Sequence, residues 1–208
     1  MGLMLVIGSK KWSSWSLRAW LALKQAGIPF EELVIPLRQP GTKPRILEYS
    51  PAGKVPVLID GNDRVWDSLA ILDYLADRFP DKELWPSDMP ARALARSIAA
   101  EMHAGFPAVR NELPMDVSHR LPTPTLSPEA AVELERIKTL WSDARSRFGA
   151  AGPFLFGRFT NADAMYAPVA TRLETYGISL DPLCHAYVQE LLNLPPMKDW
   201  YRAAAQED

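Results

Sequence analysis

Residues 51–72 read PAGKVPVLIDGNDRVWDSLAIL, and this short stretch holds the strongest structural signals in the chain. We predict a strand over 57–59, a turn over 60–63 and a returning strand over 64–66, because apolar residues flank a cluster of Asp, Gly and Asn. Pro56 directly precedes the first strand. A proline has no N–H for strand pairing, so it marks an edge or the mouth of a cleft. The stretch therefore predicts a hairpin that borders a cleft.

A helix is predicted to begin directly after this hairpin, at Asp67 and Ser68. Apolar residues then recur every three or four positions from Leu69 to Phe79, which is the helical period. Free backbone N–H groups at a helix start, beside a hydroxyl, favour an anion such as a carboxylate. The same Asp-Ser pair would also serve as a helix cap with nothing bound. From these residues alone, both interpretations stay open.

The combination of these motifs resembles the glutathione site of cytosolic glutathione transferases. It consists of Lys54-Val55-Pro56 ahead of a hairpin and of Asp67-Ser68 at the start of the next helix. The resemblance implies that glutathione is the co-substrate and that the backbone of Val55 holds its cysteinyl unit. It also implies that Pro56 is cis, and that Asp67 and Ser68 bind the γ-glutamyl end. Lys54 would pair with the glycine carboxylate or face water.

Composition excludes several classes of function. The 208 residues carry 23 basic and 25 acidic side chains, a net charge of −2, so we predict no nucleic-acid or membrane partner. One cysteine, Cys184, excludes an internal disulfide and a cysteine-based zinc site, and no metal-ligand cluster is evident. The sequence shows no run of about 18 apolar residues and no signal-peptide pattern. We therefore expect a cytoplasmic protein without a metal centre.

The first part of the chain alternates between strand and helix signals. We predict strands over 3–7 and 30–37, a loop over 9–14, a helix over 15–26 and a brief helix over 44–49. A loop that follows a strand and precedes a helix lies at the carboxyl end of the sheet, where open α/β sheets bind ligands. With the hairpin and its following helix, this order resembles the thioredoxin-like domain of glutathione transferases.

We predict two domains joined by a proline-rich linker. Residues 1–80 would form an α/β thioredoxin-like domain, residues 81–90 the linker, and residues 91–208 an all-α helical bundle. Thr160 and Asp163 are placed like a capping box, which we assign to folding. The helices of the second domain are expected at 91–112, 128–148, 164–176, 182–194 and around Trp200.

The chemistry implied by the resemblance needs a group that ionises the glutathione thiol. An unperturbed thiol has a pKa of about 8.5, so only a small fraction is thiolate at neutral pH. A hydrogen bond to a charged group is worth roughly 1.5–3 kcal/mol, equivalent to about one to two pKa units. The loop after the first strand offers four hydroxyls that can supply this bond, from Ser9, Ser13, Ser14 and Ser16.

The resemblance narrows this choice to two serines. Bacterial Ser-type members of the family place the activating serine four or five residues before an arginine of the first helix. Arg18 puts Ser14 at four and Ser13 at five, so we predict Ser13 with Ser14 as the alternative. Either hydroxyl would also suit a helix N-cap. The loop contains no tyrosine, which separates the chain from Tyr-type members.

Further contacts to glutathione are predicted for basic residues of the same half. Lys43 and Arg38 lie in the segment where the family supplies additional basic contacts. Lys10 and Lys11 would flank the entrance and attract an anionic tripeptide, or they would be ordinary exposed loop lysines. The sequence leaves both alternatives open.

The second substrate is expected to meet the helical domain. Met102, His103, Phe106 and Arg110 share a helical spacing, and Arg110 would suit an anionic acceptor. The same residues would equally form a core stripe with one satisfied histidine. His119, in a proline-spaced loop, is expected at the surface.

The resemblance implies a homodimeric, detoxifying transferase that conjugates glutathione to a small electrophile. An isomerase of the maleylacetoacetate type is the alternative, since the serine-rich loop is similar to that of the zeta class. The chain has Trp12-Ser13-Ser14-Trp15 where that class has Ser-Ser-Cys. A noncatalytic binding module of the same fold is a third possibility, because fold alone does not decide function.

Overall fold

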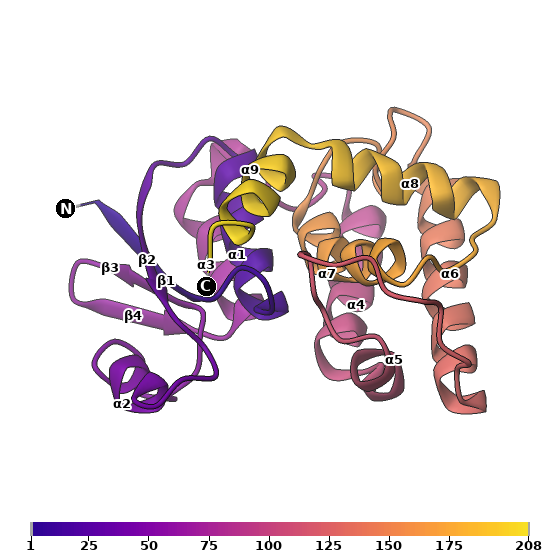
Figure 1. Cartoon of the computed structure of the whole chain (residues 1–208). Helices are drawn as coiled ribbons and strands as arrows, with labels where there is room; N and C mark the ends of the chain where they lie inside the picture. Colours follow the sequence, from indigo (N-terminus) through magenta and orange to yellow (C-terminus); the bar gives the residue numbers. More distant parts are fainter. Residues whose placement is uncertain (1, 208) are drawn as a thin grey trace.

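The computed structural model describes residues 2–207, and the first part of the chain is built on a four-stranded mixed sheet (Figure 1). The strands stand in the order β2-β1-β3-β4, with β2 parallel to β1 and the other neighbours antiparallel. The predicted hairpin is confirmed, with each strand one residue longer than expected. The strand bounds are β1 Leu3–Gly8, β2 Phe30–Ile35, β3 Val57–Asp60 and β4 Asp63–Trp66.

The hairpin brings two predicted ligand-binding segments together. A two-residue turn that begins at Gly61 joins the strands, and Gly61 adopts a φ of 60°, which glycine tolerates because it has no Cβ. The register then sets Trp66 opposite Val57. Pro56 and Asp67 flank this pair in the sequence, so the proline and the next helix start become neighbours at one end of the hairpin.

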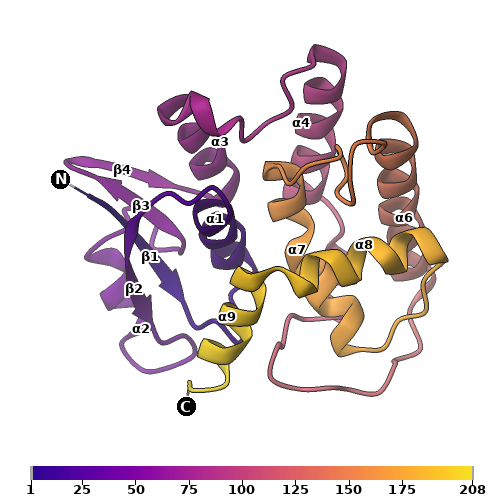
Figure 2. The same ribbon diagram turned by 90° about the horizontal axis from the view of Figure 1, so that it is seen from above.

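Three helices cover the two faces of the sheet (Figure 2). Helices α1, Ser14–Gln25, and α3, Ser68–Arg78, pack on one face in the main core. Helix α2, Thr42–Leu47, packs on the other face, where Ile46 joins Val6 in a smaller apolar cluster. Alternate residues of β1 therefore face opposite layers, as the period of a strand requires. Helix α2 begins two residues before the predicted segment 44–49.

The second part of the chain is helical, as predicted. Its first segment differs from the expected helix over 91–112, because the structure breaks at Gly105 and Phe106. Phe106 has a φ of 61° and precedes Pro107, and a residue before proline is disfavoured in the α conformation. The bounds are η1 Pro80–Lys82, α4 Met89–Ala104, α5 Pro107–Glu112, α6 Pro128–Phe148, α7 Asn161–Thr175, α8 Pro182–Asn193 and α9 Pro195–Ala204.

Helix α7 lies at the centre of this part, and nearly all of its residues are buried. The predicted capping box at its start is confirmed: the Asp163 carboxylate accepts from the backbone N–H of Thr160 at 2.8 Å and from its hydroxyl at 3.0 Å. Pro168 lies inside the helix without ending it. At the start of α7, the Asn161 side chain also donates to the Leu72 carbonyl of α3 at 2.9 Å, which ties the two parts of the chain together.

The last helix returns to the α/β part, where both views show α9 beside α1 (Figures 1 and 2). Trp200 of α9 meets Trp20 of α1 edge to face, with ring centroids 5.0 Å apart. One cluster of buried apolar residues runs from the sheet through the helices. We retain 1–80 and 91–208 as a proposed division, with α4 already beginning inside the predicted linker.

The described residues contain neither a membrane-spanning helix nor a group of metal-binding side chains. Among residues 2–207, no helix has the length and apolarity needed to cross a membrane. Within the same residues, no group of three or more His, Cys, Asp or Glu side chains is arranged to hold a metal ion.

Candidate functional site

A cavity of about 770 Å³ opens where the hairpin, the starts of α1 and α3, and the end of α4 meet. Seven of the ten predicted site residues line it, and six further residues complete its wall. The predicted ones are Ser13, Lys54, Val55, Pro56, Asp67, Ser68 and His103. The others are Trp12, Trp15, Leu37, Ile46, Ala52 and Trp66.

The wall before β3 has the predicted backbone geometry. The Val55–Pro56 peptide bond is cis, which confirms that expectation. Pro56 is buried and Val55 is half-buried, whereas Lys54 is exposed at the rim. The side of the cavity nearest the sheet is therefore mostly apolar, with one positive charge at its edge.

The opposite wall is formed by the start of α3. Asp67 is its N-cap, and its carboxylate accepts from the Leu69 backbone N–H at 2.9 Å. Asp67 also has a φ of 77°, an uncommon conformation for a residue other than glycine. The second carboxylate oxygen lies 3.4 Å from Nε2 of His103. Ser68 is buried, and its hydroxyl accepts from Nη1 of Arg18 at 3.3 Å.

The two candidate serines differ in position. Ser13 lines the cavity, whereas Ser14 is the buried first residue of α1 and is not among the lining residues. Ser13 occupies the N-cap position without a side-chain cap bond to the described residues. Its hydroxyl instead donates to Oγ of Ser16 at 2.6 Å, and Ser16 accepts from the Gly8 backbone N–H at 3.1 Å. Ser16, which the resemblance did not select as the activating serine, therefore holds the Ser13 hydroxyl from one turn further along α1.

An aromatic and cationic stack lies beside Ser13. The guanidinium carbon of Arg18 is 4.4 Å from the centroid of the Trp15 ring, and that of Arg110 is 4.9 Å from it. His103 meets the same ring edge to face at 5.3 Å. Arg18 is completely buried, and burial lowers its pKa, with the positive charges of Arg110 and Arg172 acting in the same direction.

Trp12 and Trp15 are the main lining residues that the sequence reasoning missed as ligand contacts. Both are next to a predicted serine, so their position in the sequence was the available signal. Trp66, at the end of β4, was assigned only to the hairpin, although it also lines the cavity. Aromatic walls of this kind supply apolar surface to a small ligand.

Arg110 is absent from the lining that the described residues form, although the sequence placed it near the second substrate. Its guanidinium donates to the carbonyls of Met102 and Gly105, the latter at 2.9 Å, and so satisfies the end of α4. Met102 and Phe106 are buried in the core, as the alternative interpretation expected. His103 is the one residue of this set that reaches the cavity.

The other basic residues serve contacts within the protein. Nζ of Lys43 donates to the Gly53 carbonyl at 2.8 Å, and Arg38 lies over the Trp12 ring at 4.4 Å. Lys10 is not the exposed loop lysine that the sequence allowed, whereas Lys11 is half-buried. Lys10 is buried in an ion pair with Glu32, and Lys11 donates to the backbone carbonyl of Glu207. Neither lysine lines the cavity formed by residues 2–207.

Known proteins are similar to part of this chain in sequence and to the whole chain in fold. Residues 12–78 match the family model described as "Glutathione S-transferase, N-terminal domain". A probable maleylacetoacetate isomerase from Caenorhabditis elegans is 35% identical over 98 residues, covering 47% of this chain and 45% of the relative. Glutathione S-transferase 1 of Dianthus caryophyllus is 40% identical over 83 residues, covering 39% and 38%.

The chain spans less than half the length of these two curated relatives. A structural neighbour covers more: a glutathione transferase homologue from Burkholderia, solved with bound glutathione, superposes over 100% of both chains with a TM-score of 0.74. Its sequence identity is 22%, so this similarity establishes the fold.

Proposed function

We propose that the chain is a cytosolic glutathione transferase, which binds glutathione in the cavity and conjugates it to a small electrophile; the match to the N-terminal family model and the similarity to glutathione S-transferases support this. The observation that carries this proposal is the composition of one cavity. Ser13, the cis Val55–Pro56 bond and the Asp67–Ser68 helix start all border it. The cavity also falls within the range of about 300–1,000 Å³ that is typical of small-molecule sites.

The two ends of glutathione are assigned by charge. The Asp67 carboxylate would accept from the ammonium of the γ-glutamyl unit, and the Ser68 hydroxyl and the start of α3 would bind its carboxylate. Lys54, exposed at the rim, would pair with the glycine carboxylate. The Val55 backbone would hold the cysteinyl unit between them. These contacts direct the sulfur toward the start of α1.

Ser13 is the residue proposed to ionise the thiol. When glutathione binds, its hydroxyl would turn from Ser16 and donate to the sulfur, while the Ser16 hydroxyl takes over the bond between the two serines. The thiol proton leaves to solvent and the negative charge stays on sulfur. The sulfur electron pair then forms a C–S bond to the electrophilic carbon, and a leaving group departs with its own electron pair. Trp12, Trp15 and His103 would surround the electrophile.

Replacement of Ser13 by alanine tests this role, with Ser14→Ala as the matched control. We expect Ser13→Ala to raise the pKa of bound glutathione by about one to two units, because one hydrogen bond to a charged sulfur is lost. The turnover number at neutral pH should fall about 10-fold to 100-fold for the same reason. Ultraviolet titration of the thiolate measures the pKa directly. A shift in Ser14→Ala with none in Ser13→Ala would reassign the activating hydroxyl.

A second candidate is isomerisation of a glutathione adduct. The similarity to the probable maleylacetoacetate isomerase from C. elegans supports it. Parallel assays with an aromatic chloride and with a cis-diene diacid distinguish the two activities, because only the first releases chloride. Glutathione binding without turnover of either compound would favour a noncatalytic module. We also propose a homodimer, which sedimentation would measure.

A further inference from the structure

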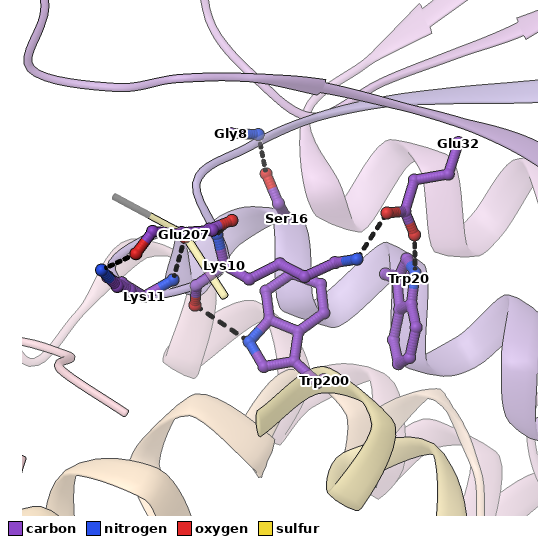
Figure 3. A network of polar contacts seen from close by, with 8 residues as sticks. All are labelled: Gly8, Lys10, Lys11, Ser16, Trp20, Glu32, Trp200 and Glu207. Atoms are coloured by element: carbon purple, nitrogen blue, oxygen red, sulfur yellow. Dashed lines mark hydrogen bonds and ion pairs between the residues drawn. The ribbon is translucent and has the colours of Figure 1, made fainter. Parts of the chain in front are cut away.

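The loop between β1 and α1, which carries Ser13, is held by residues from the far end of the chain (Figure 3). The carboxylate of Glu207 spans two consecutive backbone amides. Its Oε1 accepts from the Lys10 N–H at 2.6 Å, and its Oε2 accepts from the Lys11 N–H at 3.0 Å. The Lys11 ammonium also donates to the Glu207 backbone carbonyl. Successive amides that share one anion make a strong site, because each hydrogen bond is charge-assisted.

The carbonyls of the same two residues are also paired with distant residues. The indole N–H of Trp200 donates to the Lys10 carbonyl at 3.0 Å (Figure 3). The Val117 backbone N–H donates to the Lys11 carbonyl at 3.2 Å. All four backbone polar groups of Lys10 and Lys11 are therefore satisfied by the second half of the chain.

The Lys10 side chain fixes α9 to the α/β part. It is buried, forms an ion pair with Glu32 of β2, and lies 5.6 Å from the ring centroids of both Trp20 and Trp200. The Trp20 indole donates to the other Glu32 oxygen, so the carboxylate bridges both groups. A completely buried Trp200 cannot move without disturbing this packing.

A short turn connects these contacts to Ser13. The Ser9 carbonyl accepts from the Trp12 N–H at 3.2 Å and from the Ser13 N–H at 2.9 Å, so residues 9–13 form one compact unit. The Ser9 hydroxyl in turn accepts from the Leu37 N–H at 2.9 Å. Lys10 and Lys11 are the middle of this unit, and displacement of their backbone would displace Ser13.

We propose that Glu207 and Trp200 are positioning residues, which hold the Ser13 loop in the conformation that ionises bound glutathione. The proposal rests on the proposed function for its chemical consequence, whereas the positioning of the loop itself does not need glutathione. Release of the Glu207 carboxylate would free two amides and let the loop shift. The Ser13 hydroxyl would then meet the sulfur less often, and the thiol pKa would rise.

The experiment uses the full chain with three substitutions. Glu207→Gln offers one acceptor oxygen where the two amides need two, and Trp200→Phe retains a buried ring but loses the N–H. Glu31→Gln makes the same chemical change as the first at an exposed position of β2. Hydrogen exchange of residues 9–13 without ligand measures the loop. Ultraviolet titration of bound glutathione measures the thiol pKa, and calorimetry measures glutathione affinity.

We expect the amides of the loop to exchange about tenfold faster in Glu207→Gln, since a charge-assisted hydrogen bond is lost. The pKa of bound glutathione should rise by about half to one unit, with affinity altered less than about threefold because Asp67 and Ser68 are unchanged. Trp200→Phe should also speed the exchange of the loop amides and raise the pKa of bound glutathione. Glu31→Gln should match the unsubstituted protein.

Two results would overturn the proposal. One is unchanged exchange of the loop in Glu207→Gln. The other is faster exchange while bound glutathione keeps its original pKa, because the contact would then be merely structural. Failure of the proposed function is visible separately: the unsubstituted protein itself would give no thiolate signal with glutathione, and the ligand-free exchange would still decide whether Glu207 holds the loop.

Discussion

The two carboxylate oxygens of Asp67 have different neighbours, one in the helix and one at the cavity wall. One carboxylate oxygen caps α3, and the other lies toward His103 at the cavity wall. Asp67 has a positive φ, and both Asp67 and Ser68 line the cavity. Asparagine tolerates both the cap position and a positive φ. An Asp67→Asn protein should therefore fold and lose only the negative charge.

We expect Asp67→Asn to weaken glutathione binding by about 10-fold to 100-fold, because an ammonium loses its charged partner. The pKa of bound thiol should stay unchanged, since Ser13 is untouched. Calorimetric titration with glutathione measures the affinity, and ultraviolet titration at saturating glutathione measures the thiol pKa. Asp67→Asn should change the affinity, whereas Ser13→Ala should change the pKa. Equal affinity in Asp67→Asn and in the unsubstituted protein would show that Asp67 is only a helix cap.

The role of single residues could be predicted from the sequence where a local motif contains them, but not where it depends on a contact with a distant residue. Pro56 and Asp67 carry their own backbone signals, so the sequence identified them. The pairing of Ser13 with Ser16 needed the exact start of α1, which differs by one residue from the prediction. The burial of Lys10 depends on Trp200, which lies 190 positions away, and no local pattern contains that information.

At the scale of elements, a regular helical spacing of apolar residues can continue across a break between two helices, as it does between α4 and α5. The apolar spacing of Met102 and Phe106 predicted one helix, yet Gly105 and Pro107 were visible in the sequence. The structure ends the helix at this point, because Gly105 is extended and Phe106 adopts a left-handed conformation, and neither continues an α-helix into Pro107. The break is what lets Arg110 fold back on the end of α4.

The start of α7 predicts a specific pH dependence. The Asp163 carboxylate is completely buried, and burial raises its pKa to about 6 although Leu155, Thr160 and Tyr187 donate to it. The pKa of Asp163 is therefore higher in the folded state than in the unfolded state. Its contribution to the stability of the fold is complete below about pH 4 and declines as the pH rises through 6. Burial therefore outweighs the hydrogen bonds at this site.

Chemical denaturation of Asp163→Asn at several pH values tests this sign. The free energy of unfolding of the unsubstituted protein should lose about 3 kcal/mol from this group between pH 4 and pH 8, and the variant should lack that decline. Asp181, which caps α8, is the control, because hydrogen bonds from Cys184 lower its pKa and its stabilisation disappears as the pH falls. Identical pH profiles for Asp163→Asn and the unsubstituted protein would contradict the prediction.

At the scale of the whole molecule, the sheet and the helices share one core. Helix α1 packs against both α7 and α9, and the buried cluster is continuous. We expect one thermal transition in which calorimetric and van't Hoff enthalpies agree, as in a two-state protein. Two resolved peaks would show that the proposed division 1–80 and 91–208 is also a division of stability. The composition and the order of elements predicted both parts, but not how closely they join.

Three of the seven tryptophans line the cavity, and these are the ones the fold leaves partly exposed. Trp15 is 36% exposed and Trp66 is 47% exposed, with Trp12 between buried and exposed, whereas Trp20, Trp85, Trp141 and Trp200 are buried. Indole emission depends on contact with water and with neighbouring charges. The protein thus carries an intrinsic optical reporter, and a ligand that fills the cavity should shift its fluorescence spectrum without any added dye.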